Sequence, residues 1–216
     1  MRLIGMLDSP FVRRTAVALD MLGVPFRHEA VSVFSTFGKF QAINPVVKAP
    51  TLVLDDGMVL MDSSLILAYV ESTLSDTRAL WSPDGAARAV EYRAVSLALA
   101  ACEKCAQYIY ERNLRPAQFQ FEPWLERVGG QLRAAFSALE REVATHASTF
   151  ARDRSHASIT AAIAWSFAQS MLSTLLPAAA HPALAMLSER MERNAIFMKY
   201  PPDGPGVPSG SIAGGK

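Results

Sequence analysis

The stretch from Lys48 to Glu71 constrains the fold of this chain more than any other. It contains two short β-prone runs, 51–54 and 58–61, separated by Asp-Asp-Gly, a spacing that predicts a tight β-hairpin. A helix is predicted to begin at Asp62-Ser63, because short polar side chains accept hydrogen bonds from the first N–H groups of a helix. The segment therefore predicts a strand, a turn, a strand and a helix in close succession.

Pro50 directly precedes the first of these runs, and we expect its peptide bond to be cis. A fixed turn beside the N-terminus of a helix offers backbone hydrogen bonds and a positive dipole end to an anionic, peptide-like ligand. An ordinary hairpin followed by a helix explains the same residues equally well. The local pattern leaves both interpretations open.

The residues before this stretch predict an alternation of strands and helices. A first strand is expected over Arg2–Met6, a helix from Pro10 to Leu22, a second strand over 24–33 and a short helix over 34–43. A strand–helix–strand unit implies a parallel pair, and the hairpin adds an antiparallel edge. The predicted fold class of this part is therefore α/β, and this order of elements resembles the thioredoxin fold.

After a polar linker at 75–84, every segment has a helical pattern. We accordingly divide the chain into an α/β domain over 1–76, an all-helical domain over 85–200 and a tail over 201–216. The tail is rich in proline and glycine, so we expect it to wrap the surface or to be disordered. Within the helical domain, long helices are predicted over the ranges 88–112, 123–147 and 182–193.

The composition excludes several functional classes. The 216 residues include 21 basic and 20 acidic side chains, a net charge of +1 that gives no reason to expect nucleic acid as a partner. No apolar run is long enough to cross a bilayer, and the N-terminus lacks the features of a signal peptide. A cytoplasmic protein with no membrane partner is the natural expectation.

Several residue types have both a functional and a structural interpretation. Cys102 and Cys105 form a Cys-x-x-Cys motif, but it lies inside a predicted helix without a second Cys or His pair, which favours packing over metal or redox chemistry. His28 has no acidic or nucleophilic partner at a recognisable spacing. The aromatic residues of the helical domain either fill its core or line an apolar pocket: Tyr108, Tyr110, Phe119 and Phe121.

Three motifs resemble the glutathione transferase family. The run from Asn44 to Pro50 (Asn-Pro-Val-Val-Lys-Ala-Pro) is similar to the family's Asn-Pro-x-x-Lys-Val-Pro, which ends in its cis-proline. Asp62-Ser63 stands where the family has an acidic residue followed by serine. Ser9-Pro-Phe-Val-Arg-Arg resembles the motif of the serine-type bacterial members, although a serine before a proline is by itself an ordinary helix cap.

The resemblance implies a thioredoxin-like N-terminal domain, an all-helical C-terminal domain, a homodimer and reduced glutathione as co-substrate. Ser9 would stabilise the glutathione thiolate, the main chain of Ala49 held by Pro50 would pair with the peptide, and Asp62 and Ser63 would hold the γ-glutamyl end. Lys48 would meet a carboxylate or remain solvated. These residues comprise the predicted site: Ser9 as the catalytic residue, with Lys48, Ala49, Pro50, Asp62 and Ser63 binding glutathione, and no metal.

The chain departs from the family pattern at two positions. Ala49 replaces the usual valine, and Ser158 stands where members carry the aspartate of a Ser/Thr-x-x-Asp capping box that begins here at Ser155. We expect Ser158 to return a weaker, neutral hydrogen bond.

The predicted function is a detoxifying glutathione transferase that activates the thiol of bound glutathione for attack on a small hydrophobic electrophile. A non-catalytic, glutathione transferase-like interaction or regulatory protein is one alternative. A glutathione-dependent peroxidase is the other, whereas a thiol reductase is disfavoured because serine at position 9 cannot form a mixed disulfide.

Overall fold

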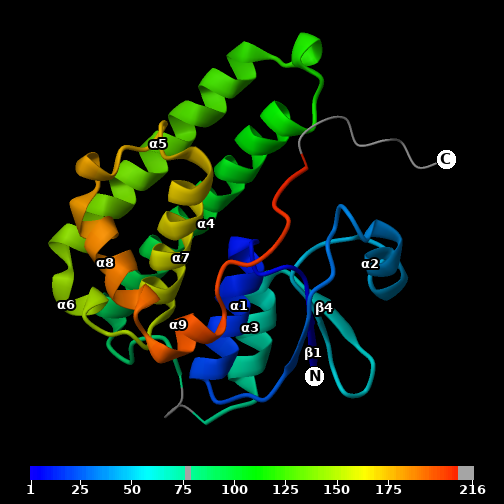
Figure 1. Ribbon diagram of the computed structural model, residues 1–216. Helices are drawn as coiled ribbons and strands as arrows, with labels where there is room; N and C mark the ends of the chain where they lie inside the picture. Colours follow the sequence, from blue (N-terminus) through cyan, green and yellow to red (C-terminus); the bar gives the residue numbers. More distant parts are fainter. Residues whose placement is uncertain (76–78, 209–216) are drawn as a thin grey trace.

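The computed structural model describes residues 1–75 and 79–208, and Figure 1 shows them as a small α/β unit beside a larger helical unit. The α/β unit contains β1 (Arg2–Ile4), α1 (Pro10–Met21), β2 (Arg27–Glu29), α2 (Phe37–Ile43), β3 (Thr51–Val53), β4 (Val59–Met61) and α3 (Ser63–Ser72). The helical unit contains α4 (Gly85–Asn113), η2 (Ala117–Phe119), α5 (Glu122–Thr145), α6 (Ala147–Phe150), α7 (His156–Leu172), η3 (Ala178–Ala180), α8 (Pro182–Glu192) and α9 (Ala195–Lys199).

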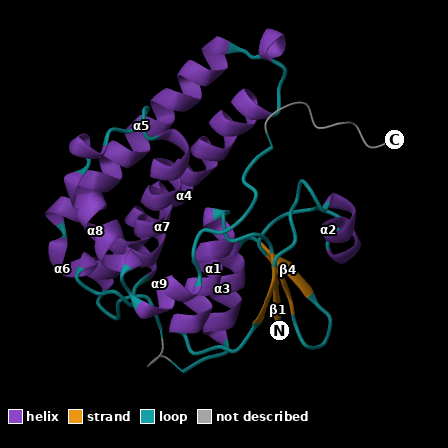
Figure 2. Cartoon of the chain, in the orientation of Figure 1, coloured by secondary structure: helices purple, strands orange, loops and turns teal. Residues whose placement is uncertain are grey.

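The strands form one mixed sheet in the order β2-β1-β3-β4. Strand β1 pairs with β2 in parallel and with β3 antiparallel, and β3 and β4 form the predicted hairpin. Gly57 supplies the positive φ of +90° that the hairpin turn requires. The predicted fold class is confirmed: a thioredoxin-like sheet with its helices, followed by an all-helical region (Figure 2).

The two faces of the sheet are buried by different helices. Leu3 and Leu52 are paired across β1 and β3 and pack into the main core with α1 and α3. Their sequence neighbours Ile4 and Val53 point to the other face, where they pack with Phe40 of α2. This alternation is the period-2 pattern of a strand buried on both faces.

The second strand is shorter than expected: only Arg27–Glu29 are strand, whereas the sequence suggested 24–33. Its length is set by its partner, β1, which itself spans Arg2–Ile4. Beyond it the chain turns, because the N–H of Ser32 donates to Oγ1 of Thr36 and the hydroxyl of Thr36 donates back to the Ser32 carbonyl. Local hydrogen bonds of the turn therefore replace the backbone hydrogen bonds that would continue the pairing of β2 with β1.

Helices α4, α5, α7 and α8 make up the body of the helical unit, and α7 packs directly on α1 of the sheet unit. Helix α7 is buried along most of its length, in keeping with its nearly continuous apolar sequence. In the described ranges 1–75 and 79–208, no helix is both long enough and apolar enough to cross a membrane.

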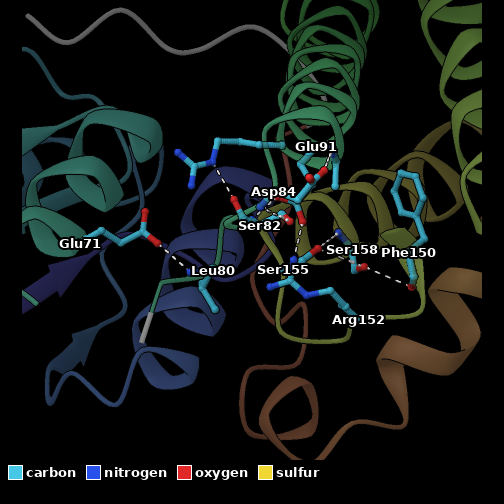
Figure 3. Close-up of polar contacts among 11 residues, drawn as sticks. Glu71, Leu80, Ser82, Asp84, Glu91, Phe150, Arg152, Ser155 and Ser158 are labelled. Carbon is cyan, nitrogen blue, oxygen red and sulfur yellow. Dashed lines mark hydrogen bonds and ion pairs between the residues drawn. The ribbon is translucent and has the colours of Figure 1, made fainter. Parts of the chain in front are cut away.

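The connection between the units is described from residue 79, and the rest of the predicted linker at 76–78 lies outside the described residues. Figure 3 shows how two carboxylates hold it: the partly buried Glu71 of α3 accepts the N–H of Leu80 at 3.0 Å, and the buried Glu91 of α4 accepts the N–H of Ser82 at 2.6 Å. The ring of Trp81 packs against the rings of Tyr92 and His156, with centroids 4.2 and 4.5 Å away. The linker is thus fixed by groups from α3, α4 and α7.

The N-terminus of α7 is capped by Ser155, whose Oγ accepts the N–H of Ser158 at 3.0 Å. The predicted return bond from Ser158 to the Ser155 N–H is not made among the described residues. The Ser158 hydroxyl instead contacts the Phe150 carbonyl oxygen at 3.3 Å (Figure 3). A neutral hydroxyl has little preference for the helix end over a nearby free carbonyl, whereas a carboxylate would be attracted to the helix dipole.

Candidate active site

A cavity of about 690 Å³ opens where the two units meet. The sheet unit contributes the turn before α1, the loop before β3 and the start of α3. The helical unit contributes one face of α4 and one of α7, and the segment after α9 completes the wall. The site residues predicted from sequence all line this one cavity: Ser9, Lys48, Ala49, Pro50, Asp62 and Ser63.

Ser9 is the N-cap residue of α1, and Pro10 follows at the first helical position. Proline suits this position because its missing N–H would have had no partner within the helix. Within residues 1–75 and 79–208, the side chain of Ser9 nevertheless makes no capping hydrogen bond. Its hydroxyl is therefore free to interact with a group in the cavity, close to the exposed N–H groups at the positive end of the helix.

The Ala49–Pro50 peptide bond is cis, as predicted. Side chains around it hold the loop in place, because the Thr51 hydroxyl donates to the Lys48 carbonyl at 2.7 Å and the Asn44 amide donates to the Thr51 hydroxyl at 2.9 Å. The main-chain N–H and C=O of Ala49 make no hydrogen bond within the part of the chain that the structure describes. Both groups are thus available to pair with a peptide.

The start of α3 is shaped by Asp62, which adopts φ = +73°, a conformation that non-glycine residues rarely take. Its Oδ1 accepts the N–H groups of Ser64 at 2.9 Å and Leu65 at 3.3 Å, so the predicted cap forms. Oδ2 has no partner among the described residues. Asp62 thereby caps the helix and still presents one carboxylate oxygen to the cavity.

Arg14 contributes to the site in a way that the sequence did not reveal. Its Nη1 donates to the hydroxyls of Ser63 at 2.9 Å and Ser64 at 3.2 Å, while Nε donates to Oγ1 of Thr160 in α7 at 2.9 Å. Because a guanidinium only donates, the Ser63 oxygen is an acceptor here and its hydrogen stays available for another group. Burial lowers the pKa of Arg14 to about 10, so the group remains charged at neutral pH.

Arg13, the other arginine of the motif, joins the two units instead. It is 2% exposed and forms a bidentate ion pair with Glu192 of α8, with both N···O distances at 2.6 Å. Its Nε also donates to the Tyr200 carbonyl at 2.7 Å. All the strong hydrogen bonds of this side chain lie within the protein, so Arg13 is not a free cation for a ligand.

The segment after α9 (red in Figure 1) returns to the turn before α1 that contains Asp8 and Ser9. Residues 201–208 are therefore part of the site. The N–H of Asp8 donates to the Asp203 carbonyl at 3.1 Å, and the Asp8 carboxylate accepts the N–H of Gly206 at 2.8 Å. Desolvation raises the pKa of the Asp8 carboxyl despite this hydrogen bond. The sequence predicted a tail that wraps the surface or is disordered; its described part covers the cavity, and 209–216 lie outside the described residues.

Of the four aromatic residues for which the sequence left a core role and a pocket role open, Tyr110 lines the cavity and Tyr108 does not. Tyr110 lines the cavity and packs edge-on against Phe34 of the sheet unit, with ring centroids 5.7 Å apart. Phe119 and Phe121 are exposed on η2 and just after it, outside the cavity lining. Helical spacing could not distinguish them, since both flank the break between α4 and α5.

The cysteines are packing residues, in agreement with the structural interpretation. Cys102 and Cys105 are buried in the main core, and burial raises the pKa of both thiols, that of Cys105 to about 12. Thiols of this kind are poor nucleophiles at neutral pH. Within residues 1–75 and 79–208, no group of His, Cys, Asp or Glu has the arrangement of a metal site.

Known proteins resemble this chain both in part and as a whole. Residues 3–78 match the family model described as "Glutathione S-transferase, N-terminal domain". Glutathione S-transferase U3 of Arabidopsis thaliana is 38% identical over 74 residues, which cover 33% of this chain and 32% of that protein. The chain thus spans about a third of the length of the curated relatives that it matches.

Solved structures extend the likeness over nearly the whole chain. A glutathione S-transferase from Methylobacterium radiotolerans, in complex with glutathione sulfonate, has a TM-score of 0.82 and 25% identity and covers 95% of this chain and 96% of its own. A maleylacetoacetate isomerase from Methylobacterium extorquens, with bound malonate and glutathione, has a TM-score of 0.66 and 25% identity, with 97% and 100% covered. Residues 3–78 therefore match the glutathione S-transferase N-terminal domain, and the chain as a whole has the fold of solved glutathione transferases.

Proposed function

We propose that this protein is a glutathione transferase that ionises the thiol of bound glutathione for attack on a small hydrophobic electrophile. The observation that carries the proposal is the convergence of unused hydrogen-bonding groups on one cavity: the Ser9 hydroxyl, the main chain of Ala49 and the hydroxyl hydrogen of Ser63. Relatives of the same fold were solved with glutathione or glutathione sulfonate bound, which supports glutathione as the co-substrate.

Each group has a role set by its chemistry. The N–H and C=O of Ala49, held in place by cis-Pro50, pair with the cysteinyl main chain of glutathione. Ser63 donates its hydroxyl hydrogen to the γ-glutamyl carboxylate, and the free Oδ2 of Asp62 accepts from the γ-glutamyl ammonium. Lys48, which is exposed on the same loop, meets the second carboxylate of the tripeptide.

Ser9 acts on the sulfur. A free thiol has a pKa of about 8.5, and lowering it by about two units makes most of the sulfur ionised at neutral pH, at a differential stabilisation of ~2.7 kcal/mol. A hydrogen bond from the Ser9 hydroxyl to the thiolate, together with the N-terminus of α1, is of this order. The thiolate electron pair then forms a carbon–sulfur bond with the electrophile, which either expels a halide ion or takes up a proton.

The decisive experiment compares the wild type with Ser9→Ala. We expect calorimetry to show glutathione binding by both proteins, because the peptide contacts remain. The pKa of the bound thiol, followed by thiolate absorbance, is expected to rise toward ~8.5 in the variant, and the conjugation rate at neutral pH to fall at least ~10-fold. Ser35→Ala removes an exposed hydroxyl outside the cavity and serves as the control.

The outcomes separate the alternatives. Glutathione binding without turnover of any electrophile by the wild type would favour a non-catalytic regulatory protein. An unchanged thiol pKa in Ser9→Ala would contradict the role of Ser9, and a chain that does not bind glutathione would overturn the proposal as a whole.

We further propose that the protein is a homodimer that works in the cytoplasm, where glutathione is kept reduced. Apolar side chains are exposed on β4, α3 and the start of α4, which supports a dimer through this face: Val59, Met61, Leu65, Tyr69 and Tyr92. Exposed apolar groups gathered on neighbouring elements are typical of a protein–protein interface.

A further inference from the structure

The helical unit contributes one almost entirely uncharged wall to the cavity. On α4, the lining residues recur at helical spacing and so lie on one face: Leu99, Glu103, Ala106, Gln107, Ile109 and Tyr110. On α7, the lining residues are Ile163, Phe167, Ser170 and Met171. Glu103 is the one charged side chain among these lining residues, and it lies in the middle of the α4 stripe.

A second carboxylate, that of Asp8 in the turn before α1, also lines the cavity. Among the described residues neither Asp8 nor Glu103 forms an ion pair, and the hydrogen bond that Asp8 accepts comes from the neutral backbone N–H of Gly206. Both negative charges are therefore left uncompensated by any side chain of the described cavity wall.

The cationic side chains near the cavity either bond to other protein groups or lie outside the half of the cavity lined by α4 and α7. Arg13 is held by Glu192 and by the Tyr200 carbonyl. Lys48 lies on the loop that ends in cis-Pro50, on the side assigned to glutathione. Lys104 does not line the cavity, and its Nζ donates to Oε1 of Gln107 at 3.1 Å.

We infer that the electrophile half of the cavity selects neutral or cationic apolar molecules and rejects anionic ones, with Glu103 as the specificity-determining residue. The inference rests on the proposed function. A dianion would meet Asp8 and Glu103 without a free cation among the described lining residues of that half to balance its charge.

The test uses a matched pair of electrophiles, chlorodinitrobenzene and its ring-carboxylated analogue. Both lose chloride to the glutathione thiolate, so each enzymatic kcat/KM is divided by the rate of the uncatalysed reaction of the same compound. At low ionic strength we expect the normalised value to be at least ~10-fold higher for the neutral compound, since like charges in an incompletely solvated site repel. Raising the salt concentration to about 1 M should shrink the difference, because Glu103 is exposed to solvent and its charge is screened by salt.

Variants assign the effect to a residue. Glu103→Gln is expected to reduce the discrimination about threefold, and Glu103→Lys to abolish or invert it. Glu126→Lys makes the same change of charge at an exposed position of α5 outside the cavity and should leave the discrimination unchanged.

The results distinguish this inference from the proposed function. If the wild type conjugates both compounds equally well after normalisation, or if Glu103→Lys has no effect on their ratio, the inference is overturned while the transferase function stands. If no electrophile turns over, the affinities of the neutral and the carboxylated S-aryl glutathione conjugates, measured by calorimetry, provide the same comparison. Failure of glutathione and of both conjugates to bind would overturn the proposed function, and the inference with it.

Discussion

At the scale of single residues, Arg14 is the side chain that connects the site to the helical unit. It bonds to the hydroxyls at the start of α3 and to Thr160 of α7 at the same time. An arginine can hold this geometry because its planar fork presents several donors in fixed directions, which a lysine cannot reproduce. We therefore regard Arg14 as a positioning residue that orients the hydroxyl of Ser63 toward the cavity.

The first prediction follows from this role. Arg14→Lys keeps a positive charge but loses part of the hydrogen-bond network, so we expect its Kd for glutathione to rise about tenfold, which corresponds to ~1.4 kcal/mol. The pKa of the bound thiol should not move, because Ser9 is untouched. Calorimetry measures the first quantity and thiolate absorbance the second.

A double-mutant cycle tests the mechanism against a mere loss of stability. If Arg14 acts through Ser63, then Ser63→Ala alone removes most of the affinity, and adding Arg14→Lys costs little more. Additive losses, or a thiol pKa that shifts in Arg14→Lys, would contradict the positioning role.

At the scale of elements, the linker is fixed by a buried His156–Glu71 pair whose titration affects stability. Nε2 of His156 lies 3.0 Å from Glu71, while Nδ1 is buried without a partner among the described residues. Desolvation lowers the pKa of His156, and an added proton would gain no acceptor at Nδ1. Burial favours the neutral form of Glu71, but the hydrogen bonds that its carboxylate accepts from His156 and from the Leu80 N–H outweigh burial, and the pKa of Glu71 is lowered.

The second prediction is a loss of stability in acid. Below the ordinary His value of 6.5 the unfolded chain binds a proton that folded His156 does not, and below the ordinary Glu value of 4.5 the same holds for Glu71. Each group therefore makes unfolding easier as the pH falls through that window, by at most ~1.4 kcal/mol per pH unit. Urea unfolding between pH 5 and 7.5 checks the first window, where the free energy of unfolding should rise with pH and the slope should correspond to the uptake of about one proton at most.

A matched pair of variants identifies the group. His156→Gln should remove most of the pH dependence of the free energy of unfolding above the range where Glu71 titrates. His146→Gln, at a partly exposed position, should leave that pH dependence unchanged. A wild-type slope that survives in His156→Gln would show that another group titrates in this range.

The third prediction concerns the segment 201–208, which covers the cavity and is tied to Asp8 by two hydrogen bonds. A chain that ends at Pro201 keeps the Tyr200 carbonyl that Arg13 requires, but loses the cover that Val207 contributes. We expect the affinity for S-hexylglutathione to fall roughly 3- to 10-fold relative to that for glutathione, because less apolar surface is buried around the hexyl chain.

The control for this truncation is a chain that ends at Pro208, which should bind both ligands as the full chain does. Equal losses for glutathione and its S-hexyl derivative would place the effect of the segment on the glutathione side. Unchanged affinities would mean that the segment is not a wall of the binding site.

At the scale of the whole molecule, the features that sequence predicted are those set by near neighbours. The hairpin, cis-Pro50 and the Asp62 cap each depend on residues a few positions apart, and so does the N-cap position of Ser9. The features that it missed join distant parts of the chain. Arg14 and Ser63 are 49 residues apart, and Asp8 and Gly206 are 198 apart.

The same reasoning explains where the predicted elements were inaccurate. Propensity extended the second strand over 24–33, but the length of an edge strand depends on the partner that it pairs with. The composition of the tail indicated irregular structure, which is correct for its described part, yet composition contains no information about where an irregular segment docks. The walls of the cavity from α4, α7 and 201–208 could therefore not be assigned without the tertiary structure.

The last prediction tests the proposed homodimer. Leu65 on α3 is 68% exposed, so Leu65→Glu removes little from the core of a monomer. In a two-fold interface each residue occurs twice, so the substitution would bury a pair of unpaired carboxylates, which costs several kcal/mol. We expect light scattering after size-exclusion chromatography to report a dimer for the wild type and a monomer for Leu65→Glu. Met186→Glu, at a 72% exposed position of α8, should remain dimeric. A wild type that is monomeric at micromolar concentration, or a Leu65→Glu variant that stays dimeric, would show that the apolar face of β4, α3 and α4 has another role.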